Sequence, residues 1–208
     1  MIHYFLDGNL GFDYRDSWRK YAGHLEFMHW NCSNIPVDRY PDLQKLIDNK
    51  KYSMLSDFVR WWAVHEYGGI YLDFDIELIA PIDKVLEFES FVSIEGYPVF
   101  PNGAASGGKK GNKYHAEILN CYFDVINGVK IYQVPIEVGC SPWMLKDYVE
   151  SKKGKPLDDS DLYQVKTYDG FVTLPKDYFY PYNWNEQYRP ELLTPNTIGI
   201  HWWKHSWK

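Results

Sequence analysis

Two aspartates separated by one residue are the side chains of this sequence best placed to do chemistry. Asp73 and Asp75 flank Phe74, and Glu77 follows two residues later. Carboxylates that share a strand face repel each other unless a cation or solvent neutralises them, and a divalent ion prefers such oxygen ligands. A flat strand would hold the two side chains roughly 6.5–7 Å apart. We therefore expect one aspartate to ligate an ion and the other to bind a ligand hydroxyl or a metal-bound water; the alternative is a solvated strand face.

Another acidic residue, Asp57, lies three positions before Arg60 on a predicted helix, away from the main apolar face of that helix. The simpler interpretation is a local ion pair, which contributes about 0.2–0.5 kcal/mol. The functional interpretation is that Asp57 accepts hydrogen bonds from sugar hydroxyls. Arg60 would then orient Asp57 and place positive charge near a phosphate.

The last eight residues, 201–208, contain two histidines, three tryptophans and two lysines. They fit an amphipathic end docked on the core, or a patch that lies on a membrane surface. They also fit a lid in which His201 gives a nitrogen ligand to the metal, while Ser206, Trp207 and a lysine engage a pyrophosphate. Oxygen ligands with one imidazole suit Mn²⁺ or Mg²⁺ better than zinc.

The elements that must position these residues are a helix and the strand after it. Apolar residues recur every three or four positions over residues 53–67, which predicts an amphipathic helix. Gly68 and Gly69 end it, and the alternation over residues 70–78 predicts one strand. In an α/β sheet the carboxyl ends of strands form the ligand crevice, so the aspartates are well placed for binding.

The remaining pattern alternates strands and helices, which favours an α/β fold with a mainly parallel central sheet flanked by helices. Residues 101–113 are rich in glycine, asparagine and lysine, and we expect a loop there. We expect strands over 2–6, 24–30, 91–95 and 198–202, and helices over 15–22, 42–49, 114–127 and 141–151.

Composition restricts the classes of protein to consider. The 208 residues fit one domain, 1–208, and 45% hydrophobic with 24% charged residues is ordinary for a globular protein. A net charge of −6 disfavours nucleic acid as a partner. Three cysteines without C-x-x-C spacing predict neither a disulfide framework nor a zinc site and fit a reducing cytosol. No apolar run approaches the roughly 18 residues of a membrane span.

The motifs resemble those of the DXD-containing sugar transferases, glycosyltransferase family thirty-two, which includes capsular polysaccharide synthesis proteins and yeast mannosyltransferases. The runs SDFVR at 56–60 and EYGGIYLDFDIE at 66–77 resemble its core motif. IHY at 2–4 is similar to its opening strand, and IGIHW at 198–202 with Ser206 and Trp207 to its closing element. The resemblance touches both ends of the chain and extends, more distantly, to the glucosylating domains of large clostridial toxins.

The resemblance implies a GT-A type fold, a nucleotide-sugar donor such as a UDP-sugar, a divalent metal and retention of anomeric configuration. By this likeness Asp75 and His201 bind the metal with Asp73, which also contacts ribose and sugar, and His205 is the alternative imidazole ligand. The implied donor-binding residues are Tyr4, Phe5, Asp57, Arg60, Tyr71, Asp73, Ser206 and Trp207. Asp57, Arg60, Asp73 and Asp75 are the implied catalytic residues.

The expected activity is hexosyl transfer to a glycan or lipid-linked oligosaccharide, as in surface polysaccharide synthesis. The implied setting is the bacterial cytoplasm, peripheral at the inner membrane. No residue of the sequence stands out as a nucleophile or base. The alternatives are a sugar-binding module without catalysis, which the 18% aromatic content favours, and a metal-dependent hydrolase.

Overall fold

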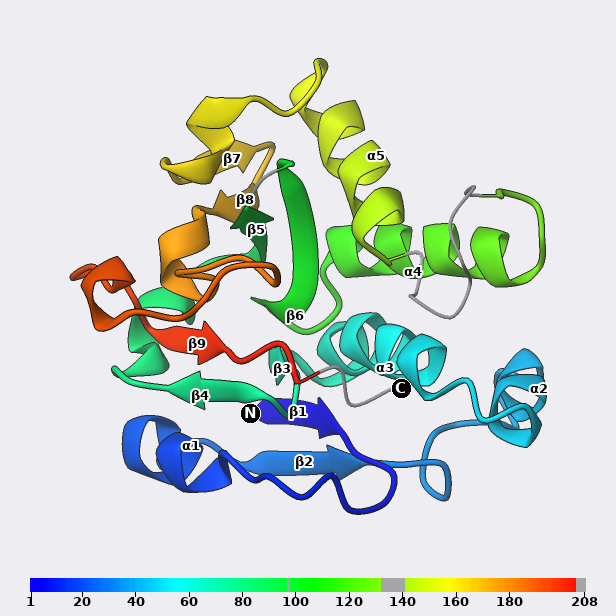
Figure 1. The fold of residues 1–208 in the computed structure, drawn as a ribbon. Helices are drawn as coiled ribbons and strands as arrows, with labels where there is room; N and C mark the ends of the chain where they lie inside the picture. Colours follow the sequence, from blue (N-terminus) through cyan, green and yellow to red (C-terminus); the bar gives the residue numbers. More distant parts are fainter. Residues whose placement is uncertain (97, 132–140, 205–208) are drawn as a thin grey trace.

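The computed structural model describes residues 1–96, 98–131 and 141–204 (Figure 1). Seven strands form the central sheet in the order β2-β1-β3-β6-β5-β8-β7. Their bounds are β1 Ile2–Phe5, β2 Phe27–Trp30, β3 Gly69–Leu72, β5 Ser90–Gly96, β6 Phe100–Gly108, β7 Lys166–Tyr168 and β8 Phe171–Leu174. A second, two-stranded sheet pairs β4 (Ile76–Leu78) with β9 (Gly199–His201).

The central sheet is mixed. β1 is parallel to both β2 and β3, and β5 is parallel to β8, whereas β6 runs antiparallel to β3 and β5 and β7 antiparallel to β8. Helices flank this sheet, as Figure 1 shows. The expected fold class, α/β with a central sheet flanked by helices, is therefore confirmed, and of the six strand pairings in the expected mainly parallel sheet three are parallel and three antiparallel.

Alternation along the strands builds a core on each face of the sheet. Tyr71 and Val92 belong to the core cluster that includes α3 (Tyr52–Tyr67), α4 (Lys113–Ile126) and α5 (Ser141–Lys153). Their neighbours Ile70 and Phe91 belong to the other cluster, which includes α1 (Arg15–Ala22). The predicted helices, including α2 (Asp42–Asp48), all form within two residues of the expected bounds. No described helix is both long and apolar enough to cross a bilayer.

The prediction of one strand over residues 70–78 is wrong. The strand ends as β3 at Leu72, residues 74–75 turn, and the chain continues as β4 in the second sheet. The Ile76 N–H donates to the Asp73 carbonyl at 3.0 Å and closes the turn. The alternation of apolar residues continues through it, because Phe74 and Ile76 are both buried, and the pattern therefore concealed the turn.

The prediction of a loop over residues 101–113 is also wrong, because β6 occupies Phe100–Gly108 between β3 and β5. The small residues of β6 allow the helix α3 to pack closely against this strand. A Cβ on Gly103 would lie 2.6 Å from Cζ2 of Trp61 and 2.7 Å from Cδ of Arg60. Composition alone indicates a loop here, whereas the reason for the glycine is the helix α3 that packs across the strand.

Candidate functional site

The turn after β3 brings together the two aspartates. The Asp73 N–H donates to the carbonyl of Ala104 in β6 at 2.8 Å, so Asp73 is held at the end of the central sheet. Asp75 lies within the turn and is buried. The bend that a shared ion would need is therefore present in the backbone, and the 6.5–7 Å spacing of a flat strand does not apply.

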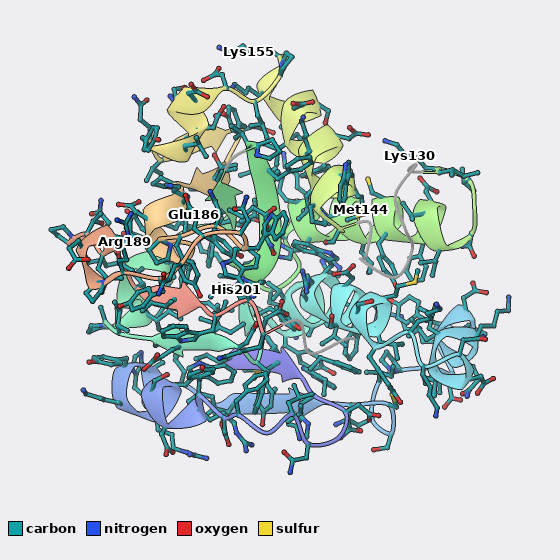
Figure 2. All side chains as sticks on the ribbon, in the orientation of Figure 1. Lys130, Met144, Lys155, Glu186, Arg189 and His201 are labelled. Atoms are coloured by element: carbon teal, nitrogen blue, oxygen red, sulfur yellow. The ribbon has the colours of Figure 1, made fainter. Side chains whose placement is uncertain are left out.

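The histidine comes from the far end of the chain. β9 pairs with β4 so that His201 lies opposite Ile76, next to Asp75 (Figure 2). The Trp202 N–H donates to the Asp75 carbonyl at 3.0 Å, and the Lys204 N–H donates to Asp75 Oδ2 at 2.9 Å. Residues 125 or more positions apart are thus joined through backbone hydrogen bonds, which orient the carboxylate and the imidazole together.

Asp73, Asp75 and His201 fit a divalent cation. One ligand atom from each lies within 4.8 Å of the others. His201 is buried, and neither of its ring nitrogens has a hydrogen-bond partner of good geometry among the described residues, although Nε2 lies 3.0 Å from Asp75 Oδ1. An imidazole 3.0 Å from one carboxylate and close to a second is a donor set that suits Mn²⁺ or Mg²⁺.

The charges at this centre are mutually dependent. Burial alone would raise the pKa of Asp75, but the His201 imidazole and the Lys204 amide hold it below its usual value. Burial alone would lower the pKa of His201, but Asp75, with Asp73 and Glu95 further away, raises it above its usual value. The Asp75 carboxylate is therefore ionised at neutral pH and attracts a cation, which would displace a proton from the His201 imidazole.

Arg60 joins the helix α3 to the aspartate pair. Its Nη1 lies 3.3 Å from Asp57 Oδ1, and its Nη2 lies 3.1 Å from Asp73 Oδ1. The guanidinium also lies 5.2 Å from the ring centroid of Tyr71. The side chains of Asp57 and Arg60 are 6% and 7% exposed, so this is a buried network and not the exposed local ion pair considered from the sequence.

Burial sets the ionisation of this network. Desolvation raises the pKa of Asp57 to about 6, against the favourable charge of Arg60 and with a further upward contribution from Asp73. Desolvation would lower the pKa of Arg60, but Asp73 and Asp57 raise it above its usual value. Arg60 is therefore a permanent cation fixed behind Asp73.

An open pocket borders the aspartates. Of the residues predicted to bind the donor, Phe5, Tyr71 and Asp73 line it, together with the metal-binding candidate Asp75. Ser53 and Ser56, from the first turns of α3, also line it. Asp57 and Arg60 are outside the lining and contact it through Asp73.

Among the described residues predicted to bind the donor, Tyr4 also lies outside the pocket lining. Tyr4 is buried and stacks on His29, with the ring centroids 5.0 Å apart, so it supports the pocket from within the core. Ser206 and Trp207 lie outside the described residues, as does the alternative ligand His205.

Sequence reasoning missed three residues that the fold places near the metal candidates. Asn102 donates through Nδ2 to Glu95 Oε2 at 2.5 Å, and Tyr180 packs its ring edge against His201 with centroids 5.5 Å apart. Glu95 also interacts electrostatically with His201. The one available signal was Glu95 itself, the one charged residue of β5.

The comparisons with known proteins agree with this geometry. Residues 12–92 match the family described as "Glycosyltransferase sugar-binding region containing DXD motif". The solved structure entitled "PaToxG Glycosyltransferase" is similar with a TM-score of 0.54 and 13% identity, over 72% of this chain and 68% of that chain. No curated protein matches the chain.

The sequence match therefore covers the glycosyltransferase DXD region within residues 12–92, and the solved structure shows a similar fold. The match includes Asp57, Arg60, Asp73 and Asp75 but ends long before His201. His201 is therefore a candidate metal ligand because of its position in the tertiary structure and because residues 198–202 resemble the closing element of the family, not because of the family match.

Proposed function

We propose that this protein is a metal-dependent glycosyltransferase that moves a hexose from a nucleotide-sugar, a UDP-sugar, to a sugar acceptor with retention of configuration. The observation that carries the proposal is the convergence of Asp73, Asp75 and His201 to within 4.8 Å beside a pocket. The buried Arg60 that connects Asp73 to Asp57 supports it further.

Each member of the site has a proposed task. Asp73, Asp75 and His201 would hold Mn²⁺ or Mg²⁺, which supplies positive charge to the diphosphate leaving group. Phe5 lines the pocket where the base would bind, with Tyr4 behind it and Tyr71 beside Asp73. Ser206 and Trp207 are proposed to contact the diphosphate, by the resemblance.

Arg60 is proposed to position the acidic residues. Its fixed guanidinium holds Asp57 and Asp73 at 3.3 and 3.1 Å, so neither carboxylate must reorganise when donor hydroxyls arrive. Preorganised groups of this kind stabilise developing charge without a further cost of orientation. Asp57 would accept hydrogen bonds from the hexose, and Asp73 from ribose or hexose.

Transfer with retention requires no protein nucleophile. The bond between the anomeric carbon and the phosphate oxygen breaks, and the acceptor oxygen bonds to the same face of that carbon. The proton of the acceptor hydroxyl passes to the departing phosphate oxygen. By the resemblance, we place the whole of residues 1–208 in this catalytic domain. The acceptor would be a glycan or lipid-linked oligosaccharide of bacterial surface polysaccharide synthesis, in the cytoplasm and peripherally at the inner membrane.

A UDP titration with and without Mn²⁺, followed by a hydrolysis panel of nucleotide-sugars, tests the proposal. Wild-type protein should bind UDP at least about tenfold more tightly with Mn²⁺ and release free hexose from one donor. Asp75→Asn removes a charged ligand and should abolish both metal effects. The matched control is Asp16→Asn, because the Asp16 side chain is 95% exposed in α1.

Three outcomes would contradict the proposal. Equal UDP affinity with and without Mn²⁺ would show that no metal takes part in donor binding. Full donor hydrolysis by a folded Asp75→Asn variant would remove Asp75 from the metal site. Binding of free glycans without any affinity for UDP would favour the sugar-binding module instead.

A further inference from the structure

The end of the β5–β6 hairpin borders the proposed donor site. The pairing of β5 with β6 shifts register between Val92 and Ser93, so that Ser93 lies opposite Asn102. The β6 residues skipped by this bulge are the ones that contact the site, since Gly103 packs on Arg60 and Ala104 accepts the Asp73 N–H. Bulges of this kind commonly re-aim side chains next to a site.

Glu95 is the charged residue of this hairpin. The five β5 residues before it are buried, whereas Glu95 is partly exposed. Asn102 fixes it, because Asn102 Nδ2 donates to Glu95 Oε2 at 2.5 Å while Asn102 Oδ1 accepts the Ala104 N–H at 2.8 Å. The Glu95 carboxylate is therefore held by the same bulge that holds Asp73.

The position of Glu95 leaves it free for a substrate. Its oxygens are not among the ligand atoms that Asp73, Asp75 and His201 bring within 4.8 Å of one another. It forms no ion pair with a lysine or arginine among the described residues, although burial raises its pKa. A carboxylate can accept about four hydrogen bonds, and Asn102 uses one. The remaining acceptor positions of this partly exposed carboxylate can take hydrogen bonds from a substrate.

Aromatic residues flank the end of the β5–β6 hairpin that carries Glu95. Phe100, the partner of Gly96 in the hairpin, packs on Trp143 of α5 with centroids 5.4 Å apart. Asn183 approaches Gly96 so closely that a Cβ there would lie 1.7 Å from Asn183 Oδ1, and the next residue, Trp184, is 62% exposed. In Figure 2, β6 runs between α5, marked by Met144, and the segment marked by Glu186.

We propose that Glu95, held by Asn102, binds hydroxyl groups of a sugar acceptor, and that Phe100, Trp143 and Trp184 provide the rings on which the acceptor packs. This inference rests on the proposed function and assigns the acceptor side of the same site. A pyranose has an apolar C–H face for aromatic rings and vicinal hydroxyls for a carboxylate. Glu95 remains a hydrogen-bond acceptor throughout, while the proton of the attacking hydroxyl passes to the departing phosphate oxygen.

The test uses the full chain with Mn²⁺ and the nucleotide-sugar that it hydrolyses. The probes are methyl α- and β-glycosides of glucose, galactose, mannose and N-acetylglucosamine, with products identified by mass spectrometry. Glu95→Gln should lower kcat/KM for the glycoside at least about tenfold, the effect of weakening a charge-assisted hydrogen bond to the substrate. Donor hydrolysis by water and Mn²⁺-dependent UDP affinity should fall less than transfer does, because Glu95 is not among the candidate metal-ligand atoms. The matched control is Glu87→Gln, an exposed glutamate.

A second variant guards against a folding defect. Trp184→Ala changes an exposed side chain and should raise KM for the glycoside several-fold while leaving the melting temperature and UDP affinity unchanged. Unchanged transfer in both variants would overturn the proposal, as would equal losses of transfer, hydrolysis and UDP binding in Glu95→Gln. A wild-type protein that hydrolyses the donor but glycosylates none of the glycosides would also overturn it. Absence of Mn²⁺-dependent UDP binding and hydrolysis in wild type would instead refute the proposed function.

Discussion

Replacement of Arg60 by methionine should destabilise the fold and make the loss depend on pH. The guanidinium lies 3.3 Å from Asp57 Oδ1 and 3.1 Å from Asp73 Oδ1. Methionine is similarly long but uncharged, so it leaves Asp57 buried beside Asp73 without a cation. Breaking a buried ion pair in this way costs about 3–5 kcal/mol. In a chain of this length such a loss lowers the melting temperature on the order of 10 °C.

The pH dependence follows from the pKa of Asp57, which burial raises to about 6 in the folded wild type. Between about pH 4 and 6 the folded state holds a proton that the unfolded state has lost, so the free energy of unfolding falls as pH rises through this window. Without Arg60 the pKa of Asp57 rises further, and the same decline extends above pH 6. The difference between wild type and variant should therefore grow above pH 6 by up to about 1.4 kcal/mol per pH unit.

Urea unfolding followed by tryptophan fluorescence at about pH 6, 7 and 8 measures this difference. The matched control is Arg19→Met, because Arg19 is 61% exposed and pairs with Asp16 at the same helical spacing. The control should change the free energy of unfolding by no more than about 1 kcal/mol. A loss below about 1 kcal/mol for Arg60→Met, or an equal loss at all three pH values, would refute the assignment of Arg60 as the cation of a buried network.

Two further substitutions test a tight packing contact behind Arg60 and a buried ion pair away from the metal candidates. Gly103→Ala places a Cβ 2.6 Å from Trp61 Cζ2 and 2.7 Å from Arg60 Cδ, so it should lower the free energy of unfolding by about 1–3 kcal/mol in thermal unfolding. This loss should shrink in a Trp61→Phe background, which removes part of the steric clash. If the losses of the two single variants simply add in the double variant, the steric reason is contradicted. Lys153→Met leaves the fully buried Asp161 without its cation and should lower the free energy of unfolding by about 3–5 kcal/mol with no change in UDP affinity. The matched control is Lys45→Met, which removes an exposed ion pair. A loss for Lys153→Met as small as that of the control would contradict the role of this buried pair.

Local sequence patterns correctly predicted the helices, whose apolar residues recur at helical spacing. α3 has apolar residues at helical spacing and ends where Gly68 takes a φ of 71°, a conformation that side chains rarely adopt. The prediction of α1 over residues 15–22 is confirmed to the residue. The link between Asp57 and Arg60 could also be predicted, because residues three apart share a helix face.

The same local patterns failed where a neighbour in space decides the structure. Residues 101–108 have a loop composition, yet they form β6 by pairing with β3 and β5. Gly103 is needed in this strand because α3 packs so closely that a Cβ there has no room. The turn after Leu72 interrupts an alternation that looks continuous in the sequence. In both cases the structure depends on contacts with a segment that is distant in the sequence, and a local sequence pattern does not contain this information.

Residue type and spacing identify the chemical groups that this protein can use: an aspartate pair, a helical Asp–Arg pair and a late histidine. Their meeting depends on the folded chain, because the turn after β3 and the pairing of β9 with β4 bring His201 to Asp75 across more than 120 residues. Only the bulged β6 strand, set by packing against α3, places Glu95 and Asn102 beside them. Long-range contacts of this kind depend on side-chain volumes and hydrogen bonds between distant segments, which spacing along the chain does not encode.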